Sequence, residues 1–202
     1  MLVHEKEHSL LGPIRFQAKR EGHEGTLGGL APQSALLLHG MIQARLLDAL
    51  KKHKIKVIVV LEGRPGMESS RYSCDQLLKR GLTPLVIADN MAGFLCYQNV
   101  IQEIWLAYQS AESQGAICPI GSLILAVLGK RHQIPVYCYP AEKVNNFLGR
   151  PKDLLFLNGQ RVTSFRINGY VPLMEWVPEK YITKFFYPPG KYKWPERLPG
   201  FS

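Results

Sequence analysis

Between residues 35 and 140, short apolar runs alternate with segments whose apolar residues recur at helical spacing. The apolar runs are typical of strands buried on both faces, and they lie at 35–39, 56–61, 84–89, 103–108 and 134–140. The segments between them predict helices at 41–53, 69–81, 90–99 and 120–133. Helices that join strands in this way form right-handed crossovers between parallel neighbours. The pattern therefore predicts an α/β fold with a mainly parallel, Rossmann-like sheet covered by helices on both faces.

The same pattern sets the expected domain boundaries. Residues 1–33 hold scattered glycines and weak periodicity, so we expect an irregular, glycine-rich arm there. Residues 34–187 are expected to form the Rossmann-like domain, with an extra hairpin that turns at Asn158-Gly159. Residues 188–202 are rich in proline, aromatic and basic residues, and we expect a tail that docks on this domain or on a subunit partner.

Composition narrows the class of protein. Hydrophobic residues make up 46% of the 202 residues and charged residues 20%, which excludes a wholly disordered chain. The net charge of +9 favours an anionic ligand or surface. The four cysteines show no C-x-x-C spacing, so we expect neither a disulfide framework nor a zinc ribbon, and we expect a cytoplasmic location. No apolar run approaches the roughly 18 residues of a membrane-spanning helix, so no membrane partner is expected.

A ligand site is expected where the strands end, because ligands of open parallel sheets bind beyond the carboxyl ends of the strands. The residues that end or follow the predicted strands are polar: His39, Glu62, Arg64, Asp89, Asn90 and Gln109. Residues 118–122 precede the last predicted helix, whose free backbone N–H groups could hold an anion. Loops are polar in any protein, so ordinary surface loops remain an alternative reading of the same residues.

Four short motifs follow one another along the chain. They are Glu62-Gly63-Arg64-Pro65 with Arg71, Asp89-Asn90-Met91-Ala92, Ile120-Gly121-Ser122, and Glu175 with Pro178, Ile182 and Thr183. In this order, the motifs resemble one superfamily over about residues 34–186. It comprises the methylthioribose-1-phosphate isomerases, the ribose-1,5-bisphosphate isomerases and the alpha, beta and delta subunits of eukaryotic initiation factor 2B. The resemblance implies the same α/β fold without the family's N-terminal helical domain, for which 33 residues leave no room, and it implies a homodimer or hetero-oligomer.

The resemblance also implies a chemistry, the aldose–ketose isomerisation of a sugar 1-phosphate, which uses a cysteine, an aspartate and a phosphate cradle. Gly40 stands where the family has its cysteine, and Gln109 stands where it has the aspartate. Glutamine cannot act as a general base, because its amide does not titrate near neutral pH. Cys118-Pro119 replaces an Asn-Lys pair that helps to hold the phosphate. The proton-transfer groups of the family are thus expected to be lost.

What remains of the family pattern is the part that would bind an anion. We therefore expect a ligand or phosphate site formed by His39, Glu62, Arg64, Arg71, Asn90, Gln109, Gly121 and Ser122. Catalysis by relocated groups is an alternative, with Asp89 and Cys118 as its candidates. A cysteine at a helix N-terminus near arginines has a lowered thiol pKa. A small residue that fills a packed turn is the plainer reading of Cys118.

Three functions remain open at this stage. The first is a divergent member of the superfamily that binds a phosphorylated small molecule or a protein partner without isomerising it. The second is an active aldose–ketose isomerase, or a related sugar-phosphate enzyme, with rebuilt catalytic groups. The third is a translation or nucleic-acid associated factor that uses a basic surface, such as the lysines between residues 51 and 56 or the tail. We expect no cofactor and no metal in any of the three.

Overall fold

The computed structural model describes residues 30–55, 57–142, 148–157, 159–163 and 167–187. Residues 1–29 of the arm expected over 1–33, and the expected tail from residue 188, lie outside the described residues.

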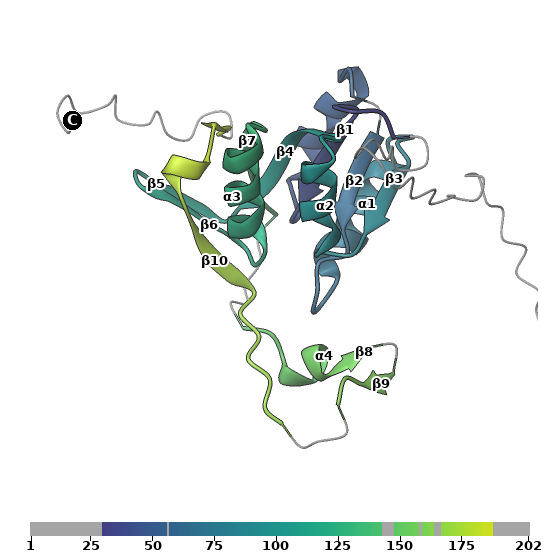
Figure 1. Cartoon of the computed structure of the whole chain (residues 1–202), viewed down its shortest axis with the longest axis vertical. Helices are drawn as coiled ribbons and strands as arrows, with labels where there is room; N and C mark the ends of the chain where they lie inside the picture. Colours follow the sequence, from purple (N-terminus) through teal and green to yellow (C-terminus); the bar gives the residue numbers. More distant parts are fainter. Residues whose placement is uncertain (1–29, 56, 143–147, 158, 164–166, 188–202) are drawn as a thin grey trace, which may run out of the picture.

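The core of the fold is a parallel sheet of six strands in the order β11-β7-β4-β1-β2-β3 (Figure 1). The strands are β1 (Ala35–His39), β2 (Val57–Leu61), β3 (Pro84–Ile87), β4 (Ile101–Tyr108), β7 (Val136–Pro140) and β11 (Lys184–Phe185). The predicted parallel sheet is confirmed, and the five predicted strands are all present. The short strand β11 was not predicted, because two residues are too few to show a pattern.

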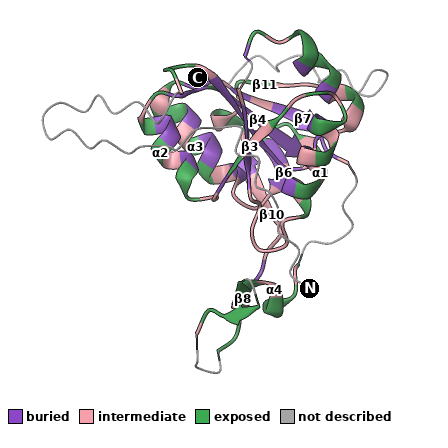
Figure 2. Ribbon diagram, turned by 90° about the vertical axis from the view of Figure 1, so that its right-hand side faces the viewer, coloured by how far each residue is buried: buried purple, intermediate pink, exposed green. Residues whose placement is uncertain are grey.

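Helices cover both faces of this sheet, as predicted (Figure 2). One face packs against η1 (Ala44–Lys52), a 3-10 helix, and α1 (Glu68–Leu78), and the other packs against α2 (Met91–Tyr97) and α3 (Ser122–His132). Successive side chains of a strand point to opposite faces, so Leu36 lies in the first layer and Leu37 in the second.

The helix predicted at 41–53 begins only at Ala44 and is a 3-10 helix. Its first residues are held extended instead, because Ile42 forms a bridge with Ala141 and the Gln43 N–H donates to the Pro140 carbonyl at 3.0 Å. These contacts tie the chain after β1 to the end of β7.

A second, antiparallel sheet was not predicted. It contains β5 (Ser110–Glu112), β6 (Gly115–Pro119) and β10 (Met174–Pro178), in the order β10-β6-β5. β10 packs so closely on β6 that a Cβ atom at Gly115 would lie 2.3 Å from the Val177 carbonyl oxygen. The short 3-10 helix η2 (Glu179–Tyr181) then leads the chain from β10 to β11.

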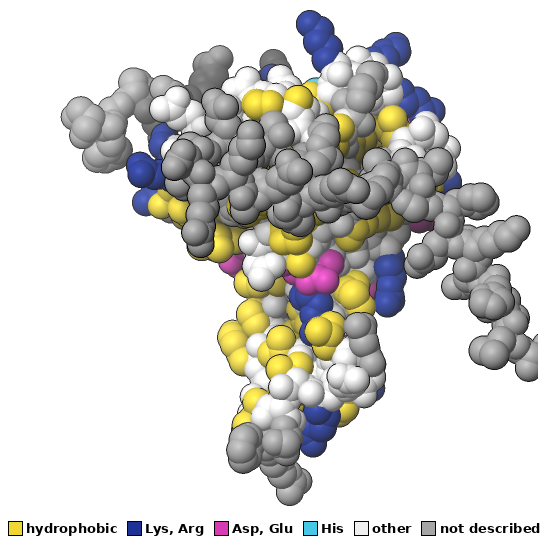
Figure 3. All heavy atoms as spheres, turned by 45° about the vertical axis from the view of Figure 1, so that its right-hand side comes forward, with side chains coloured by type: hydrophobic (Ala, Val, Ile, Leu, Met, Phe, Trp, Pro, Cys, Tyr) yellow, Lys and Arg dark blue, Asp and Glu magenta, His cyan; other side chains and the backbone are white. Residues whose placement is uncertain are grey.

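The described residues in 148–157, 159–163 and 167–170 project from the body (Figure 1). This arm holds α4 (Pro151–Leu155) and the hairpin of β8 (Phe156–Leu157) and β9 (Gln160–Arg161). The predicted hairpin is confirmed as a short one, with two residues in each strand. Hydrophobic side chains gather over the projection in Figure 3, and α4 buries no residue. Within the described residues, no helix is both long and apolar enough to cross a membrane.

Candidate functional site

The strand order reverses direction between β1 and β4. From β1 the chain builds the sheet outward through β2 and β3, and from β4 it builds the other way through β7 and β11. Such a switch point leaves a crevice beyond the carboxyl ends of the two strands, where ligands of open α/β sheets bind. A cavity of about 200 Å³ lies at this place, next to His39 at the end of β1 and Gln109 after β4.

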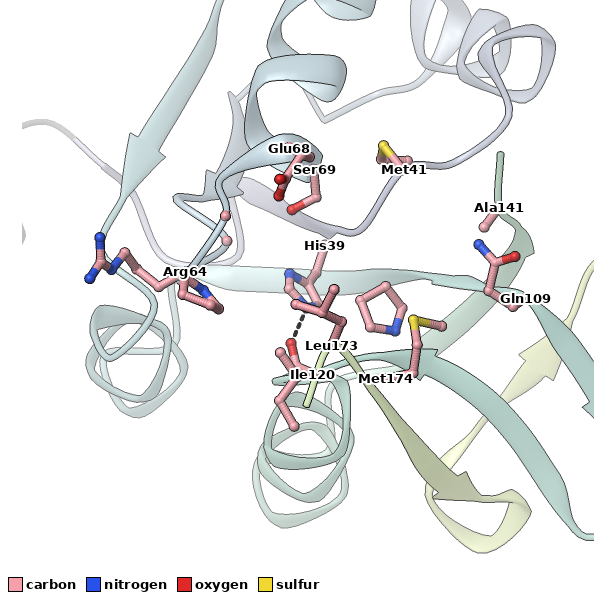
Figure 4. A pocket seen from close by; sticks show the side chains of 14 residues that line it. His39, Met41, Arg64, Glu68, Ser69, Gln109, Ile120, Ala141, Leu173 and Met174 are labelled. Atoms are coloured by element: carbon pink, nitrogen blue, oxygen red, sulfur yellow. Dashed lines mark hydrogen bonds between the residues drawn. The ribbon is translucent and has the colours of Figure 1, made fainter. Parts of the chain in front are cut away.

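Apolar side chains form most of the cavity wall. They are Met41, Pro65, Pro119, Ile120, Ala141, Leu173 and Met174. Polar side chains reach it only at a few points, and Figure 4 shows Glu68 and Ser69 across the cavity from Leu173 and Met174. Pockets of this kind, apolar with a few placed polar groups, are typical of sites for small ligands. Three of the ten predicted site residues line it, namely His39, Arg64 and Gln109.

His39 is the titratable group at the base of the cavity. Its side chain is 4% exposed, and Nε2 lies 2.9 Å from the Ile120 carbonyl oxygen, as the dashed line in Figure 4 shows. Burial lowers the pKa of His39, and this effect outweighs the Ile120 hydrogen bond and the nearby carboxylates of Asp89 and Glu175, which raise it. The ring is therefore neutral near pH 7, and because a carbonyl only accepts, Nε2–H donates and Nδ1 keeps its lone pair.

Asp89 acts on the backbone of the loop between β2 and α1. One carboxylate oxygen accepts the Gly63 N–H at 2.9 Å and the other accepts the Arg64 N–H at 2.8 Å. Both residues line the cavity, whereas Asp89 does not. The carboxylate thus fixes the position of one cavity wall.

Arg64 lies at the mouth of the cavity and does not point into it. Figure 4 shows its guanidinium turned away from His39, and Nη2 lies 3.5 Å from the Phe156 carbonyl oxygen of the projecting arm. Gln109 is held in place by the hydrogen bond that its Nε2 donates to the Glu142 carbonyl at 2.8 Å.

The predicted position of Cys118 at a helix start is wrong. Cys118 is the fourth residue of β6, and α3 begins only at Ser122. Its side chain is fully buried against Cys138. A hydrogen bond with Cys138 and burial raise the pKa of the Cys118 thiol, the opposite of the predicted lowering. The structure provides no thiolate at this position, and the side chain packs as a small apolar group.

The start of α3 faces a carboxylate of the chain itself. The Leu123 N–H donates to Oε1 of Glu175 at 2.8 Å, so a residue on β10 occupies part of the predicted anion site at Gly121 and Ser122. The Ser122 hydroxyl is buried and has no hydrogen-bond partner among the described residues. Neither residue lines the cavity.

The remaining predicted residues lie around the rim and outside the cavity wall. Arg71 and Asn90 are exposed, and Glu62 is half-buried. The residues that sequence reasoning missed come mainly from segments with no motif, above all Leu173 and Met174. Ser69 had a signal, since it stands in the first turn of a helix that follows a strand. Across the described residues, no group of three or more His, Cys, Asp or Glu side chains could hold a metal ion.

Comparison with known proteins places this geometry in a family. The family model described as "Initiation factor 2 subunit family" matches residues 33–190. This chain belongs to the Initiation factor 2 subunit family. Methylthioribose-1-phosphate isomerase of Thermus thermophilus is 24% identical over 157 residues, which cover 72% of this chain and 48% of that protein. The chain thus spans about half the length of the curated relatives it matches.

Two solved structures of similar fold bear different names. 5-methylthioribose 1-phosphate isomerase of Pyrococcus horikoshii matches with a TM-score of 0.64 at 23% identity, over 76% of this chain and 49% of that one. The delta subunit of translation initiation factor eIF-2B from A. fulgidus matches with a TM-score of 0.63 at 18% identity, over 79% of this chain and 55% of that one. At these sequence identities, the two matches show that the fold is shared.

Position 40 is where the resemblance implies that this chain departs from the family's pattern. The resemblance places the family's cysteine here, where the chain has Gly40 with a φ angle of +85°. A Cβ atom at Gly40 would lie 2.6 Å from the Ala107 Cβ and 3.0 Å from the Pro119 Cγ. The space for a cysteine side chain in this family member is therefore filled by β4 and β6.

Proposed function

We propose that this chain is a binding member of the Initiation factor 2 subunit family, which holds a phosphorylated small molecule in the cavity between β1 and β4 without isomerising it. The observation that carries the proposal is Gly40. A cysteine there would have to adopt a left-handed backbone conformation and displace Ala107 or Pro119.

Three further positions at which the resemblance or the sequence suggested a proton-transfer group are unsuited to that role. Gln109 replaces the family's aspartate and does not titrate near neutral pH. Asp89 accepts two backbone N–H groups, and the Cys118 thiol is buried with a raised pKa. Isomerisation of an aldose needs a base that removes a proton and an acid that returns it, so these positions favour binding alone.

The cavity suits a ligand with a charged end and a less polar body. The wall near Met41, Pro119 and Ile120 is apolar and would contact the body of the ligand. The Ser69 hydroxyl lines the cavity, and the Arg64 guanidinium would reach the same phosphate by turning inward from the Phe156 carbonyl. A guanidinium forms strong paired hydrogen bonds with phosphate. This arrangement moves the expected phosphate position from the start of α3 to the loop after β2.

Thermal unfolding of the full chain with a panel of aldose 1-phosphates tests the proposal. A bound ligand stabilises the folded state, so the melting temperature should rise without formation of a ketose. Arg64→Ala should abolish the rise. Arg45→Ala is the charge-matched control, because Arg45 is exposed on η1, and it should keep the rise. An unchanged rise in Arg64→Ala, or no rise with any member of the panel, would contradict the site.

An active isomerase is the second candidate, and His39 is the observation that favours it. Its ring is neutral and its Nδ1 keeps a lone pair, and the side chain lines the cavity. Relatives of this chain include proteins named methylthioribose-1-phosphate isomerase. Under this alternative, the full chain forms a ketose 1-phosphate and His39→Gln loses that activity. Equal activity in His39→Gln would exclude His39 as the acid or base.

A further inference from the structure

A second hollow lies at the edge of the parallel sheet opposite to the cavity. Its volume is about 460 Å³, and it opens where two strands begin, since Pro135 comes directly before β7 and Thr183 directly before β11. The cavity described above lies beyond the carboxyl ends of β1 and β4, and the two share no lining residue. The hollow is therefore a separate feature of the surface.

Two segments that are far apart in the sequence form the walls of this hollow. The C-terminal turn of α3 contributes one wall and η2 contributes the other, and these two helices lie side by side (Figure 1). Ile134 and Ile182 lie between them and supply apolar surface. We call this feature the α3–η2 hollow.

The backbone around the α3–η2 hollow is held firmly. The Ile134 N–H donates to the Gly129 carbonyl at 2.8 Å, and the Thr183 N–H donates to the Val136 carbonyl at 2.8 Å. Gly129 lets the end of α3 lie directly on β7, because a Cβ atom there would overlap the Val136 Cγ2. The two walls are thus fixed to the same strand, β7, and keep their spacing.

Each wall presents one lysine, Lys130 from α3 and Lys180 from η2, and both side chains are exposed. Within the described part of the chain, no acidic side chain lines the hollow and no ion pair involves either lysine. Glu179 is the neighbour of Lys180 in the sequence, but it does not line the hollow. Two cations that face one concave surface raise the positive potential there and attract anions.

The fold itself accounts for only one of these two lysines. A cation in the last turn of a helix interacts favourably with the helix dipole, which explains Lys130 together with Arg131 and His132. Lys180 belongs to another element, and its Nζ lies 5.1 Å from the centroid of the Tyr181 ring. An ammonium group on a ring keeps its charge and has N–H donors left for an anion. The helix dipole does not explain why this second cation faces the same hollow.

Uncharged donors complete the lining. The Thr183 Oγ1 accepts the Val136 N–H at 3.0 Å, which fixes the oxygen, and the hydroxyl proton can be donated to a ligand. The Gln133 amide group also lines the hollow. Lysine binds phosphate as a point charge, so two lysines and a hydroxyl suit phosphate oxygens. The volume falls within the range of roughly 300–1,000 Å³ that is typical of small-molecule sites.

We propose that the α3–η2 hollow binds a small phosphate-bearing anion with at least two negative charges, held by Lys130, Lys180 and the Thr183 hydroxyl. The inference goes beyond the proposed function and does not depend on it, because the hollow and the cavity lie at opposite edges of the sheet.

Calorimetric titration of the full chain with inorganic pyrophosphate, at constant ionic strength, tests the site. The double substitution Lys130→Gln with Lys180→Gln should weaken binding by more than about tenfold, because hydrogen bonds from charged groups are lost. The charge-matched control is Lys51→Gln with Lys52→Gln, exposed on η1, which packs on the other face of the sheet. It should keep the affinity, and so should Arg64→Ala in the cavity.

Three outcomes of the titration would overturn the proposal. They are no binding of pyrophosphate, equal losses in the two double variants, and loss of binding in Arg64→Ala, which would assign the anion to the cavity. The substituted lysines are exposed, so the melting temperature of the unliganded double variants should match that of the unaltered chain.

Acetylation of the unaltered chain by acetic anhydride gives a second measurement that needs no variant. Pyrophosphate should protect Lys130 and Lys180 from acetylation and leave Lys51 and Lys52 as reactive as before, as peptide mass mapping would show. Equal reactivity of Lys130 and Lys180 with and without pyrophosphate would contradict the proposal.

Discussion

Gly40 is the residue on which the functional account rests most heavily. Its φ angle of +85° disfavours any side chain, and its surroundings would contact a Cβ atom at 2.6 Å and 3.0 Å. The resemblance implies that the family's cysteine is replaced, but the sequence could not show that the space is closed. That information comes from Ala107 and Pro119, which lie far from Gly40 in the sequence.

Gly40→Ala should therefore destabilise the fold by about 2–4 kcal/mol, because backbone strain and steric overlap add. Urea unfolding measures the change. Gly81→Ala is the matched control, since Gly81 has a φ angle of +72° and nothing within 4 Å of a Cβ atom. It should cost only the strain, about 1–2 kcal/mol. Equal costs in the two variants would show that the site at Gly40 is open.

Asp89→Asn should cost about 1–3 kcal/mol, because the new amide group would face a backbone N–H that the carboxylate now accepts. Asn90→Ala is the control, since Asn90 is exposed, and it should change stability by less than about 0.5 kcal/mol. Urea unfolding of both variants checks the difference. If Asp89→Asn were as mild as its control, the carboxylate would not hold the loop.

His39 should make the folded state less stable in mild acid. Its pKa is lowered from 6.5 by burial, so below pH 6.5 the unfolded chain binds a proton that the folded chain does not. Lowering the pH from 7.5 to 5.5 therefore favours unfolding, by at most about 1.4 kcal/mol for each pH unit. His39→Gln removes this contribution, so urea unfolding should show a weaker pH dependence in the variant. The same dependence in both proteins would contradict the burial effect.

At the scale of elements, the strands and helices with a clear period were predictable and the short ones were not. The run over 103–108 is a strand because its apolar side chains face helices on both sides, a pattern that the sequence shows directly. β5 and β6 carry no such pattern, and their pairing with β10 joins segments far apart in the chain. Because this sheet was not predicted, Cys118 was expected at a helix start and not in β6.

The projecting arm should contribute little to the stability of the body. Leu157 and Val162 are 48% and 63% exposed, and neither belongs to a core cluster. Leu157→Asp or Val162→Asp should therefore change the free energy of unfolding by less than about 0.5 kcal/mol. Leu106→Ala in β4 is the contrast, since Leu106 is fully buried, and it should cost about 2–5 kcal/mol. A large loss from either arm variant would show that the arm packs on the body.

At the scale of the whole molecule, the fold and the place of the cavity followed from the alternation of strands and helices. The detailed site did not. His39, Arg64 and Gln109 were found because they lie at or shortly after the ends of strands. Leu173 and Met174 were missed because they lie just before and at the start of β10, which was not predicted. The direction in which Arg64 points depends on the arm, which the sequence does not place. Association into a homodimer or hetero-oligomer stays a prediction.

The most direct test of the central claim follows binding and chemistry in one sample. The full chain is incubated with each aldose 1-phosphate of the panel, and phosphorus NMR records the ligand over time. The account predicts that the signal of at least one ligand broadens on binding, that Arg64→Ala removes the broadening, and that no ketose signal appears. Accumulation of a ketose 1-phosphate would contradict the claim that this family member binds without isomerising.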